Sequence, residues 1–154
     1  AATGATTAVP TGIQTIYNGA AWVTVTEVGA YSGTTGTTTS TSYVTTLTGD
    51  TTAVSVTLQT GTSALITLSG YGSHATIAAA IWQTISVSGA TTIAAADSNA
   101  IVGASFAAAA PATLVRSAVI TGLTAGTNTF TLNYKTSAGT ATYSARQLTV
   151  KGIA

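Results

Sequence analysis

The stretch TLVRSAVITGLTAGTNTFTLNYKTSAGTATYSARQLTV, residues 113–150, decides the fold class. It contains three runs rich in β-branched and aromatic residues, Thr113–Thr121, Thr127–Tyr134 and Thr140–Val150, a composition typical of β-strands. The segments GLTAG and TSAG connect these runs. Because connections this short cannot hold a crossover helix, we expect the three strands to be antiparallel neighbours.

The same pattern continues upstream of this stretch. Turn signals recur every 8–12 residues, and about eight strands fit into the body of the chain, which is typical of an antiparallel β-sandwich, either jelly-roll or immunoglobulin-like. We expect the fold class to be all-β, a jelly-roll-like sandwich. The upstream strands are predicted at Thr41–Leu47, Ala53–Leu58, Ala64–Leu68 and Ile77–Val87, with less regular candidates at Thr91–Ala96 and Asn99–Ala107 and a loop at Ser69–Ser73.

Two alanine-rich segments leave alternatives open. Alanine is the best helix former, so the start of Ile77–Val87 is compatible with a helix, although the β-branched second half favours a long strand. The tract Ala107–Ala110 runs into Pro111, which disfavours helical conformation in the preceding residue. A short helix, a strand edge and a loop are all compatible with that tract.

The N-terminal part predicts an extended arm and a hairpin. Residues 1–11 contain no periodic apolar pattern, and Asn18-Gly19 separates two β-prone runs, which is the strongest short-range signal for a hairpin with a two-residue type I′ turn. The segment Glu27–Ser40 is rich in Gly, Ser and Thr and is interpreted as a linker. The expected domains are therefore 1–26 for the arm and hairpin, 27–40 for the linker and 41–154 for the sandwich.

The hairpin supplies the candidate assembly contacts, which are Ile13, Ile16, Tyr17 and Trp22. A two-stranded hairpin is marginally stable alone, so these apolar side chains need a surface to pack on. That surface could belong to the same domain, to a sister subunit or to another protein.

The composition excludes several classes of partner and cofactor. Only 5% of the residues are charged and the net charge is +1, so the chain lacks the basic footprint of a nucleic-acid-binding protein. No apolar stretch reaches the length of a membrane helix, and no signal peptide is visible. The absence of Cys excludes a disulfide scaffold and a thiolate metal site. We expect no cofactor, no nucleic acid and no membrane partner.

The residues that could carry catalysis are few and scattered. The chain has one histidine, His74, and three acids, Glu27, Asp50 and Asp97, none of them spaced as a catalytic pair. There is no G-x-S-x-G motif, and Gly70-Tyr71-Gly72 lacks the third glycine and the lysine of a phosphate loop. We expect a chain that is not an enzyme, with His74 in a surface loop. A calcium site at Asp50 or Asp97 would lack the usual D-x-D run.

The aromatic residues are assigned to core or ligand by position. Trp82, Phe130 and Tyr134 lie inside predicted strands and are expected to fill the core. A glycan site would need an exposed aromatic ring beside Asp, Asn or Gln side chains. Tyr71, Asp97 and Asn99 are the residues that suggest one.

Several motifs resemble phage virion proteins of the tail-fibre, head-fibre and capsid-decoration kind. IYNGAAWVTV, residues 16–25, is similar to the Y-[ND]-G-x-x-W module near the N-terminus of such chains. TSTSYV, SALITL, ISVSGATT, VITGLTAGTNTFTLNYKT and GTATYSARQLTV resemble their C-terminal β-sandwich domain. The GLTAGTNTF segment also looks like a fibronectin type III corner, but Ala125 stands where that family has proline and Thr129 where it has tyrosine.

The resemblance implies a non-enzymatic protein on the exterior of a virion, often trimeric. A chain of 154 residues fits a capsid decoration (cement) protein, bound to the major capsid protein or to other virion proteins, if the chain is complete. It begins at Ala1, as after removal of an initiator Met or as a processed fragment. The alternatives are a tail- or head-fibre module that recognises host surface glycan, and a bacterial adhesin or carbohydrate-active module.

Overall fold

The computed structural model describes residues 15–17, 21–76, 78–104 and 110–153. Within these ranges the chain is built from β-strands, and its one helical segment is the 3-10 turn η1 (Asp97–Asn99). The strands are β1 (Thr15–Tyr17), β2 (Trp22–Thr24), β3 (Glu27–Ser32), β4 (Gly36–Thr38), β5 (Ser55–Thr60), β6 (Ser63–His74), β7 (Ala80–Gly89), β8 (Ile101–Ala104), β9 (Ala112–Thr121), β10 (Gly126–Thr136) and β11 (Ala141–Gly152).

The strand pairing is that of a long hairpin rolled up on itself. β7 pairs with β8, β6 with β9, β5 with β10 and β3 with β11, all antiparallel. In the sequence, the two strands of each pair flank the pair named before it. Two further pairings, β10 with β7 and β11 with β6, join these hairpins into the sheets β5-β10-β7-β8 and β3-β11-β6-β9. This order of eight strands in two sheets is a jelly roll, so the predicted fold class is confirmed.

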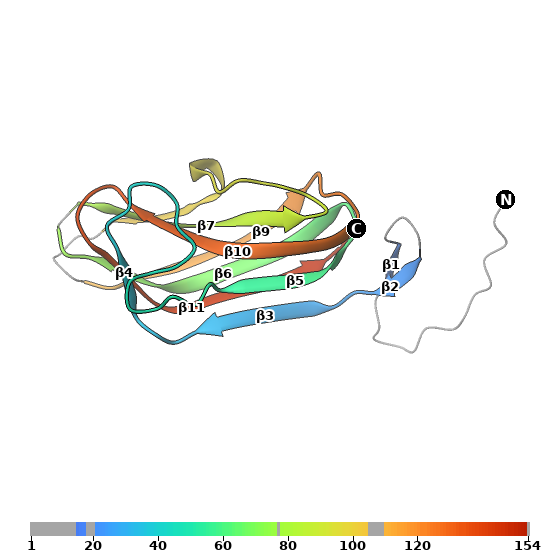
Figure 1. The fold of residues 1–154 in the computed structure, drawn as a ribbon, viewed down its shortest axis with the longest axis horizontal. Coiled ribbons are helices and arrows are strands. Elements are labelled where there is room, and N and C mark those ends of the chain that lie inside the picture. Colours follow the sequence, from blue (N-terminus) through green and yellow to red (C-terminus); the bar gives the residue numbers. More distant parts are fainter. Residues whose placement is uncertain (1–14, 18–20, 77, 105–109, 154) are drawn as a thin grey trace, which may run out of the picture.

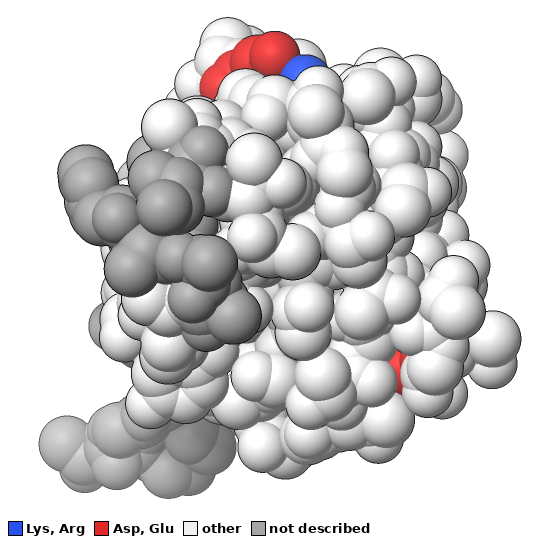
Figure 2. Space-filling view, turned by 90° about the vertical axis from the view of Figure 1, so that its left-hand side faces the viewer, with Lys and Arg blue, Asp and Glu red and all other residues white. Residues whose placement is uncertain are grey.

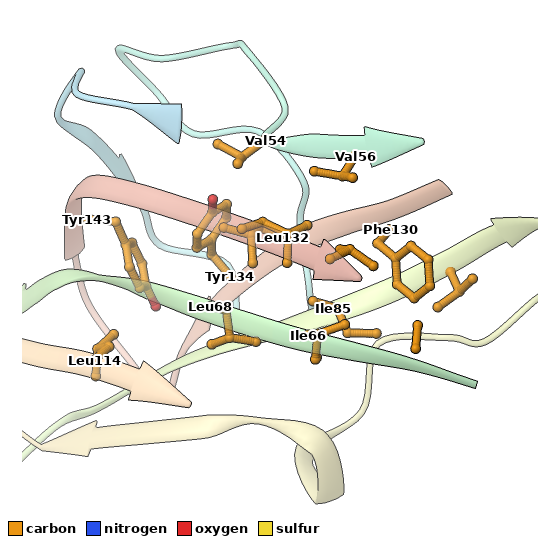
Figure 3. Packing of buried hydrophobic residues seen from close by; sticks show 14 of the residues in the cluster. Val54, Val56, Ile66, Leu68, Ile85, Leu114, Phe130, Leu132, Tyr134 and Tyr143 are labelled. Carbon is orange, nitrogen blue, oxygen red and sulfur yellow. The ribbon is translucent and has the colours of Figure 1, made fainter. Parts of the chain in front are cut away.

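The two sheets face each other and enclose one apolar core (Figure 1). Along the regular strands of the two sheets alternate side chains point inward, as the period of two in Val54, Val56 and Leu58 predicted. Phe130 and Tyr134 lie in this core as expected (Figure 3). Trp82 does not. It has the opposite parity to its neighbour Ile81 and lies half-buried on the outer face of its sheet.

The expectation that short connections join neighbouring strands is wrong. β9 lies in one sheet and β10 in the other, and the next connection carries the chain back to β11 in the first sheet. The sheets of a sandwich are only about 10 Å apart, so a loop of a few residues crosses between them as easily as it closes a hairpin. Loop length alone therefore did not distinguish the two arrangements.

The segment Glu27–Ser40 is not a linker. β3 pairs with β11 from Glu27↔Lys151 to Ser32↔Arg146, and β4 pairs with the first residues of β11. Both strands therefore occupy the same edge of the sheet, interrupted by residues 33–35. The small side chains that resembled a linker form an edge strand because Val28 and Ala30, on alternate positions, pack against the core.

The segment Thr41–Leu47, predicted as a strand, forms none. It makes isolated bridges, Val44 with Tyr134 and Leu47 with Asp50. The backbone N–H of Val44 donates to Tyr134 O, and the N–H of Tyr134 donates to Val44 O. This segment crosses the end of the sandwich and does not extend along a neighbouring strand.

The predicted loop at Ser69–Ser73 lies in the second half of β6, which runs unbroken for 12 residues. The glycines there are required by close packing and not by a turn. A Cβ at Gly72 would lie 2.3 Å from Ile81 Cδ1 and 3.1 Å from Leu114 Cδ1. The opposite sheet therefore approaches β6 at a point where only glycine fits.

A β-bulge in β11 changes which residues face the core. The register with β6 shifts between Ser144 and Gln147, and Ala145 adopts a positive φ of 47°. Before the bulge Tyr143 points inward, and after it Arg146 and Leu148 do. One extra residue thus switches the parity of the strand and turns Arg146 into the core.

The expected hairpin before the sandwich is present as β1 and β2, which lie beyond one end of the sheets (Figure 1). Its register pairs Tyr17 with Trp22, which leaves four residues between the strands. A two-residue loop at Asn18-Gly19 would pair Tyr17 with Ala20, so that turn assignment is wrong by this register. Residues 18–20 lie outside the described residues, as do Ile77 and the first three alanines of the tract Ala107–Ala110.

Candidate functional site

The candidate assembly contacts lie at or before the hairpin. Ile13 lies outside the described residues, and Ile16 and Tyr17 belong to β1, where the structure describes the backbone only. Trp22 begins β2, and 73% of its surface is exposed. The role of these four residues in assembly stays a prediction.

The core contains a buried ion pair. Arg146 Nη2 contacts Asp50 Oδ2 and donates a hydrogen bond of 3.1 Å to Ser32 Oγ, and Arg146 Nη1 donates to Tyr134 Oη at 3.3 Å. Ser32 Oγ in turn donates to Asp50 Oδ2. The guanidinium carbon lies 5.3 Å from the centre of the Tyr134 ring. This network connects β3, β10, β11 and the loop that carries Asp50.

The pKa shifts and the burial of this network indicate a structural role for the ion pair. Hydrogen bonds from Ser32 and from the backbone N–H of Thr52 lower the pKa of Asp50, and the charge of Arg146 adds to the effect. Burial raises the pKa of Tyr134 to about 12, although Arg146 acts in the opposite direction. Since Arg146 is fully buried and Asp50 nearly so, neither group is presented to a substrate.

His74 is buried, contrary to the expectation of a surface loop. It is the last residue of β6 and has no exposed surface. The backbone N–H of Thr76 lies 2.9 Å from Nδ1, and Nε2 lies within hydrogen-bond distance of Ala138 O. A neutral ring that accepts at Nδ1 and donates from Nε2 satisfies both contacts. His74 therefore ties two loops together at one end of the sandwich.

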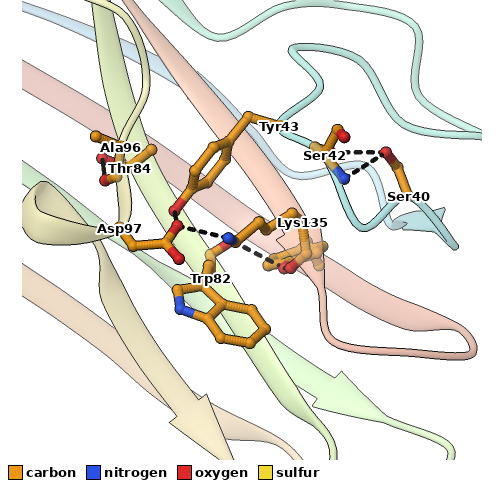
Figure 4. A network of polar contacts seen from close by, with 9 residues as sticks. Ser40, Ser42, Tyr43, Trp82, Thr84, Ala96, Asp97 and Lys135 are labelled. Carbon is orange, nitrogen blue, oxygen red and sulfur yellow. Dashed lines mark hydrogen bonds and ion pairs between the residues drawn. The ribbon is translucent and has the colours of Figure 1, made fainter.

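A second polar cluster lies on the outer face of the β5-β10-β7-β8 sheet (Figure 4). Lys135 Nζ lies 2.5 Å from Asp97 Oδ1 and 4.8 Å from the ring centres of both Tyr43 and Trp82. Tyr43 Oη donates to the same Asp97 oxygen at 2.8 Å. Lys135 and Tyr43 lower the pKa of Asp97, while burial and the bond to Asp97 raise the pKa of Tyr43. Four segments are thereby joined, and the ammonium occupies the space between the two rings.

The glycan site suggested by the sequence is not assembled. Tyr71 points outward from the β3-β11-β6-β9 sheet, whereas Asp97 and Asn99 belong to η1, whose acid contacts Lys135 on the opposite sheet. A hollow of about 560 Å³ lies at another place, lined by residues 37–40, 44, 46–49 and 51. Its lining is mostly hydroxyl-bearing and contains no Trp, Tyr or charged side chain.

Neither a metal cluster nor a membrane helix occurs in the described part of the chain. There, no three His, Cys, Asp or Glu side chains are grouped as ligands, and the two acids considered for calcium are already paired with Arg146 and Lys135. The described ranges also contain no helix with the length and apolar character to cross a bilayer.

The outer face of the β3-β11-β6-β9 sheet is the most apolar exposed surface of the described residues. Cross-strand register places its side chains in rows, such as Tyr31–Gln147–Ser69–Val115 and Glu27–Lys151–Leu65–Val119. We call this surface the apolar face. Five of the eight large apolar residues that the structure exposes lie on it, namely Tyr31, Leu65, Tyr71, Val115 and Val119.

The outer face of the other sheet differs in chemistry. Its side chains form a ladder of hydroxyl and amide contacts across β5 and β10, with Ser55 to Thr131 at 2.9 Å, Thr57 to Thr129 at 2.8 Å and Gln59 to Thr127 at 2.6 Å. Among the eight exposed large apolar residues, only Val102 lies on this face, where it pairs with Trp82. The two faces therefore offer different surfaces to a partner.

The sequence did not reveal the buried pair or the apolar face. Arg146 lies 96 positions from Asp50, so no local motif joins them. One signal was present, because Tyr143 and Leu148 are five positions apart and cannot both face the core in a regular strand. The apolar face could be predicted only with the strand order, which places β3 and β9 at the two edges of one sheet.

No protein-family model matches the sequence, and no curated protein matches it. Solved structures do match. A chain of the infectious bursal disease virus Gt strain aligns with a TM-score of 0.61 and 11% identity, over 86% of this chain and 36% of that chain. The VP2 subviral particle of the same virus aligns with a TM-score of 0.55 and 14% identity, over 86% and 35%. Eiger TNF from S. frugiperda aligns with a TM-score of 0.54 and 13% identity, over 83% and 93%.

These likenesses concern the fold. The chain has a β-sandwich of the kind found in viral capsid proteins, with an identity too low to carry more than the architecture. It spans about a third of the length of the viral chains that it matches.

Proposed function

We propose that this chain is a non-enzymatic structural protein of a phage virion, which decorates the exterior of the head and stabilises it. The observation that carries the proposal is the jelly-roll sandwich, whose architecture is that of viral capsid proteins. A structural role also agrees with the state of the reactive groups, since His74, Asp50 and Arg146 are buried in contacts within the chain. Figure 2 shows one end of the molecule, where charged atoms are few among uncharged side chains.

We propose further that the arm and hairpin make most of the contact with the major capsid protein or another virion protein. The hairpin lies beyond the sandwich, where it can reach a neighbouring subunit without disturbing the core (Figure 1). Trp22 is largely exposed, and burying an aromatic side chain of this kind contributes roughly 1.5–3 kcal/mol. The proposed contacts are Ile13, Ile16, Tyr17 and Trp22. We propose that the particle-bound form is a homo-oligomer, with three copies as the favoured number.

Binding to heads that lack this protein tests the proposal. We expect the wild-type chain to occupy regular sites on the icosahedral shell in images of the particles. Trp22→Ala should weaken binding roughly 10- to 100-fold, the equivalent of the burial free energy. The control is Val102→Ala, which truncates an exposed apolar residue on the sandwich and should leave occupancy unchanged.

Two results would contradict parts of this proposal. If deletion of residues 1–25 leaves the occupancy unchanged, the sandwich itself is the docking element. If the chain does not bind heads but binds host surface glycan, the fibre alternative replaces decoration.

A further inference from the structure

We propose that copies of this chain contact one another through the apolar face, the outer surface of the β3-β11-β6-β9 sheet. The inference deepens the homo-oligomer of the proposed function, because it names the surface on which self-association rests. It is independent of how the chain attaches to a head.

The apolar content of this face is the first reason. Soluble monomers rarely expose large contiguous apolar patches, and those they expose commonly mark interaction sites. Here Val119 on β9 pairs directly with Leu65 on β6, and Val115 and Tyr71 lie further along the same two strands. Tyr31 lies on the opposite edge strand, separated from Val115 by Gln147 and Ser69. The corresponding face of the other sheet has Val102 alone among the exposed large apolar residues of the described chain.

One pair of hydroxyl groups and one pair of charges on the apolar face are suited to being covered. Thr67 and Ser117 form a hydrogen bond of 2.9 Å across β6 and β9, so these hydroxyls already have a partner when water is removed. The face carries two of the seven charged residues, Glu27 and Lys151, which are opposite in sign and directly paired in register at one end. A second copy presents the same neutral surface with the same opposite charges, so two copies meet without net repulsion.

The extent of the face is the third reason. A ten-residue strand at about 3.3 Å per residue is about 33 Å long, and four strands about 4.8 Å apart span roughly 19 Å. The face therefore covers about 600 Å² per copy, near the roughly 800 Å² per partner of a standard specific interface. A second copy seated on it would bury about 1,200 Å² in total, which is the lower end of the range for specific, stable interfaces.

The experiment measures the mass of the purified full chain in solution by sedimentation equilibrium, with no particle present. We expect the wild type at tens of micromolar to have a mass two or three times its 15.0 kDa. Val115→Lys places a charge in the Tyr31–Gln147–Ser69–Val115 row of the apolar face and should return the mass to 15.0 kDa. Tyr71→Lys, a second variant on the same face, should act in the same direction.

The matched control is Val102→Lys. Val102 is 53% exposed against 60% for Val115, both are valines in edge strands, and Val102 lies on the opposite face. This variant should keep the wild-type mass. Circular dichroism and thermal unfolding of each variant check that the sandwich is intact. Both valines are more than half exposed, so we expect the fold to tolerate lysine at either position.

Three outcomes would overturn the inference. They are a wild-type chain that stays monomeric at tens of micromolar, a mass unchanged in both Val115→Lys and Tyr71→Lys, and a mass reduced equally by Val102→Lys. A monomeric wild type that still occupies heads would refute this inference and leave the proposed function standing, with the face free for a capsid subunit. A wild-type chain that forms oligomers through this face but does not bind heads would refute the proposed function and leave this inference standing.

Discussion

Arg146 and Asp50, 96 positions apart in the chain, form an ion pair inside the sandwich, with Ser32 bridging them. The bulge at Ala145 turns Arg146 inward, and the bridge between Leu47 and Asp50 holds the loop that presents the carboxylate. The pair therefore fastens the loop at residues 47–50 to the centre of β11. Only seven residues of the chain are charged, and two of them form this buried pair.

Loss of one partner of this pair should be strongly destabilising. In Arg146→Met the Asp50 carboxylate stays in the interior without its cation, and breaking a buried pair in this way typically costs about 3–5 kcal/mol. The free energy of unfolding in urea measures the effect. Lys151→Met, in the same strand but on the outer face, is the control and should change stability by less than about 0.5 kcal/mol.

The double variant Arg146→Met with Asp50→Leu should recover part of the loss, because no charge is then left unpaired. If the effects of the two substitutions simply add, the pair is not coupled, and the contact contributes nothing specific to the fold.

Stability should fall at acidic pH through Asp50 and Asp97. The pKa of each carboxyl is lower in the folded chain than its ordinary value of 3.8. The unfolded chain therefore binds these protons more tightly, so the contribution is fully present above that value and is lost as pH falls through it toward the folded-state pKa. Urea unfolding from about pH 5 to about pH 2 should show this decline.

Two substitutions separate the contributions to that decline. Asp50→Asn removes the carboxyl of the buried pair, and Asp97→Asn removes the one on the surface. Each should flatten part of the slope against pH, whatever it does to stability at neutral pH. A slope unchanged in both variants would show that other carboxyls are responsible.

Alternation of apolar residues predicted the strands well where the strand is regular. β5, β9, β10 and the later part of β7 lie within a few residues of their predicted positions, because Val, Ile and aromatic side chains on alternate positions must face one core. Sheet membership could not be predicted in this way. It depends on which loops cross the sandwich, and a short connection serves both purposes.

Small residues account for most of the remaining differences. Gly70 and Gly72 were interpreted as a turn, but they stand where the opposing strand and sheet come close. Likewise Gly, Ser and Thr in residues 27–40 were interpreted as a linker, although Val28 and Ala30 anchor an edge strand there. His74 was expected in a surface loop, because the sequence cannot show the carbonyl of Ala138 that lies within hydrogen-bond distance of its ring.

Gln83 should be replaceable by an apolar residue with a gain in stability. Its side chain is fully buried, and neither amide atom has a hydrogen-bond partner among the described residues. Gln83→Met keeps a similar length and removes the unsatisfied amide, so the free energy of unfolding should rise by about 1–2 kcal/mol. Thermal and urea unfolding measure this change.

Gln59→Met is the control for that substitution. Gln59 is exposed and donates to Thr127 Oγ1 at 2.6 Å, so its replacement should bring no gain. If Gln83→Met is less stable than the wild type, the buried amide has a partner that compensates its burial.

Glycine at position 145 should make the fold more stable than the native alanine does. In a regular strand the same substitution lowers stability. The φ of 47° at Ala145 lies in the left-handed region, which costs a residue with a Cβ about 1–2 kcal/mol. Glycine removes that cost but loses about 0.5–1 kcal/mol in chain entropy, so Ala145→Gly should be more stable by about 0.5–1 kcal/mol. Ala118→Gly, within the regular strand β9, should be less stable by about 1 kcal/mol and serves as the control. Urea unfolding of the two variants compares these signs directly. Because the bulge is what turns Arg146 into the core, equal losses in both variants would mean that β11 runs without it, and the buried pair would then need another explanation.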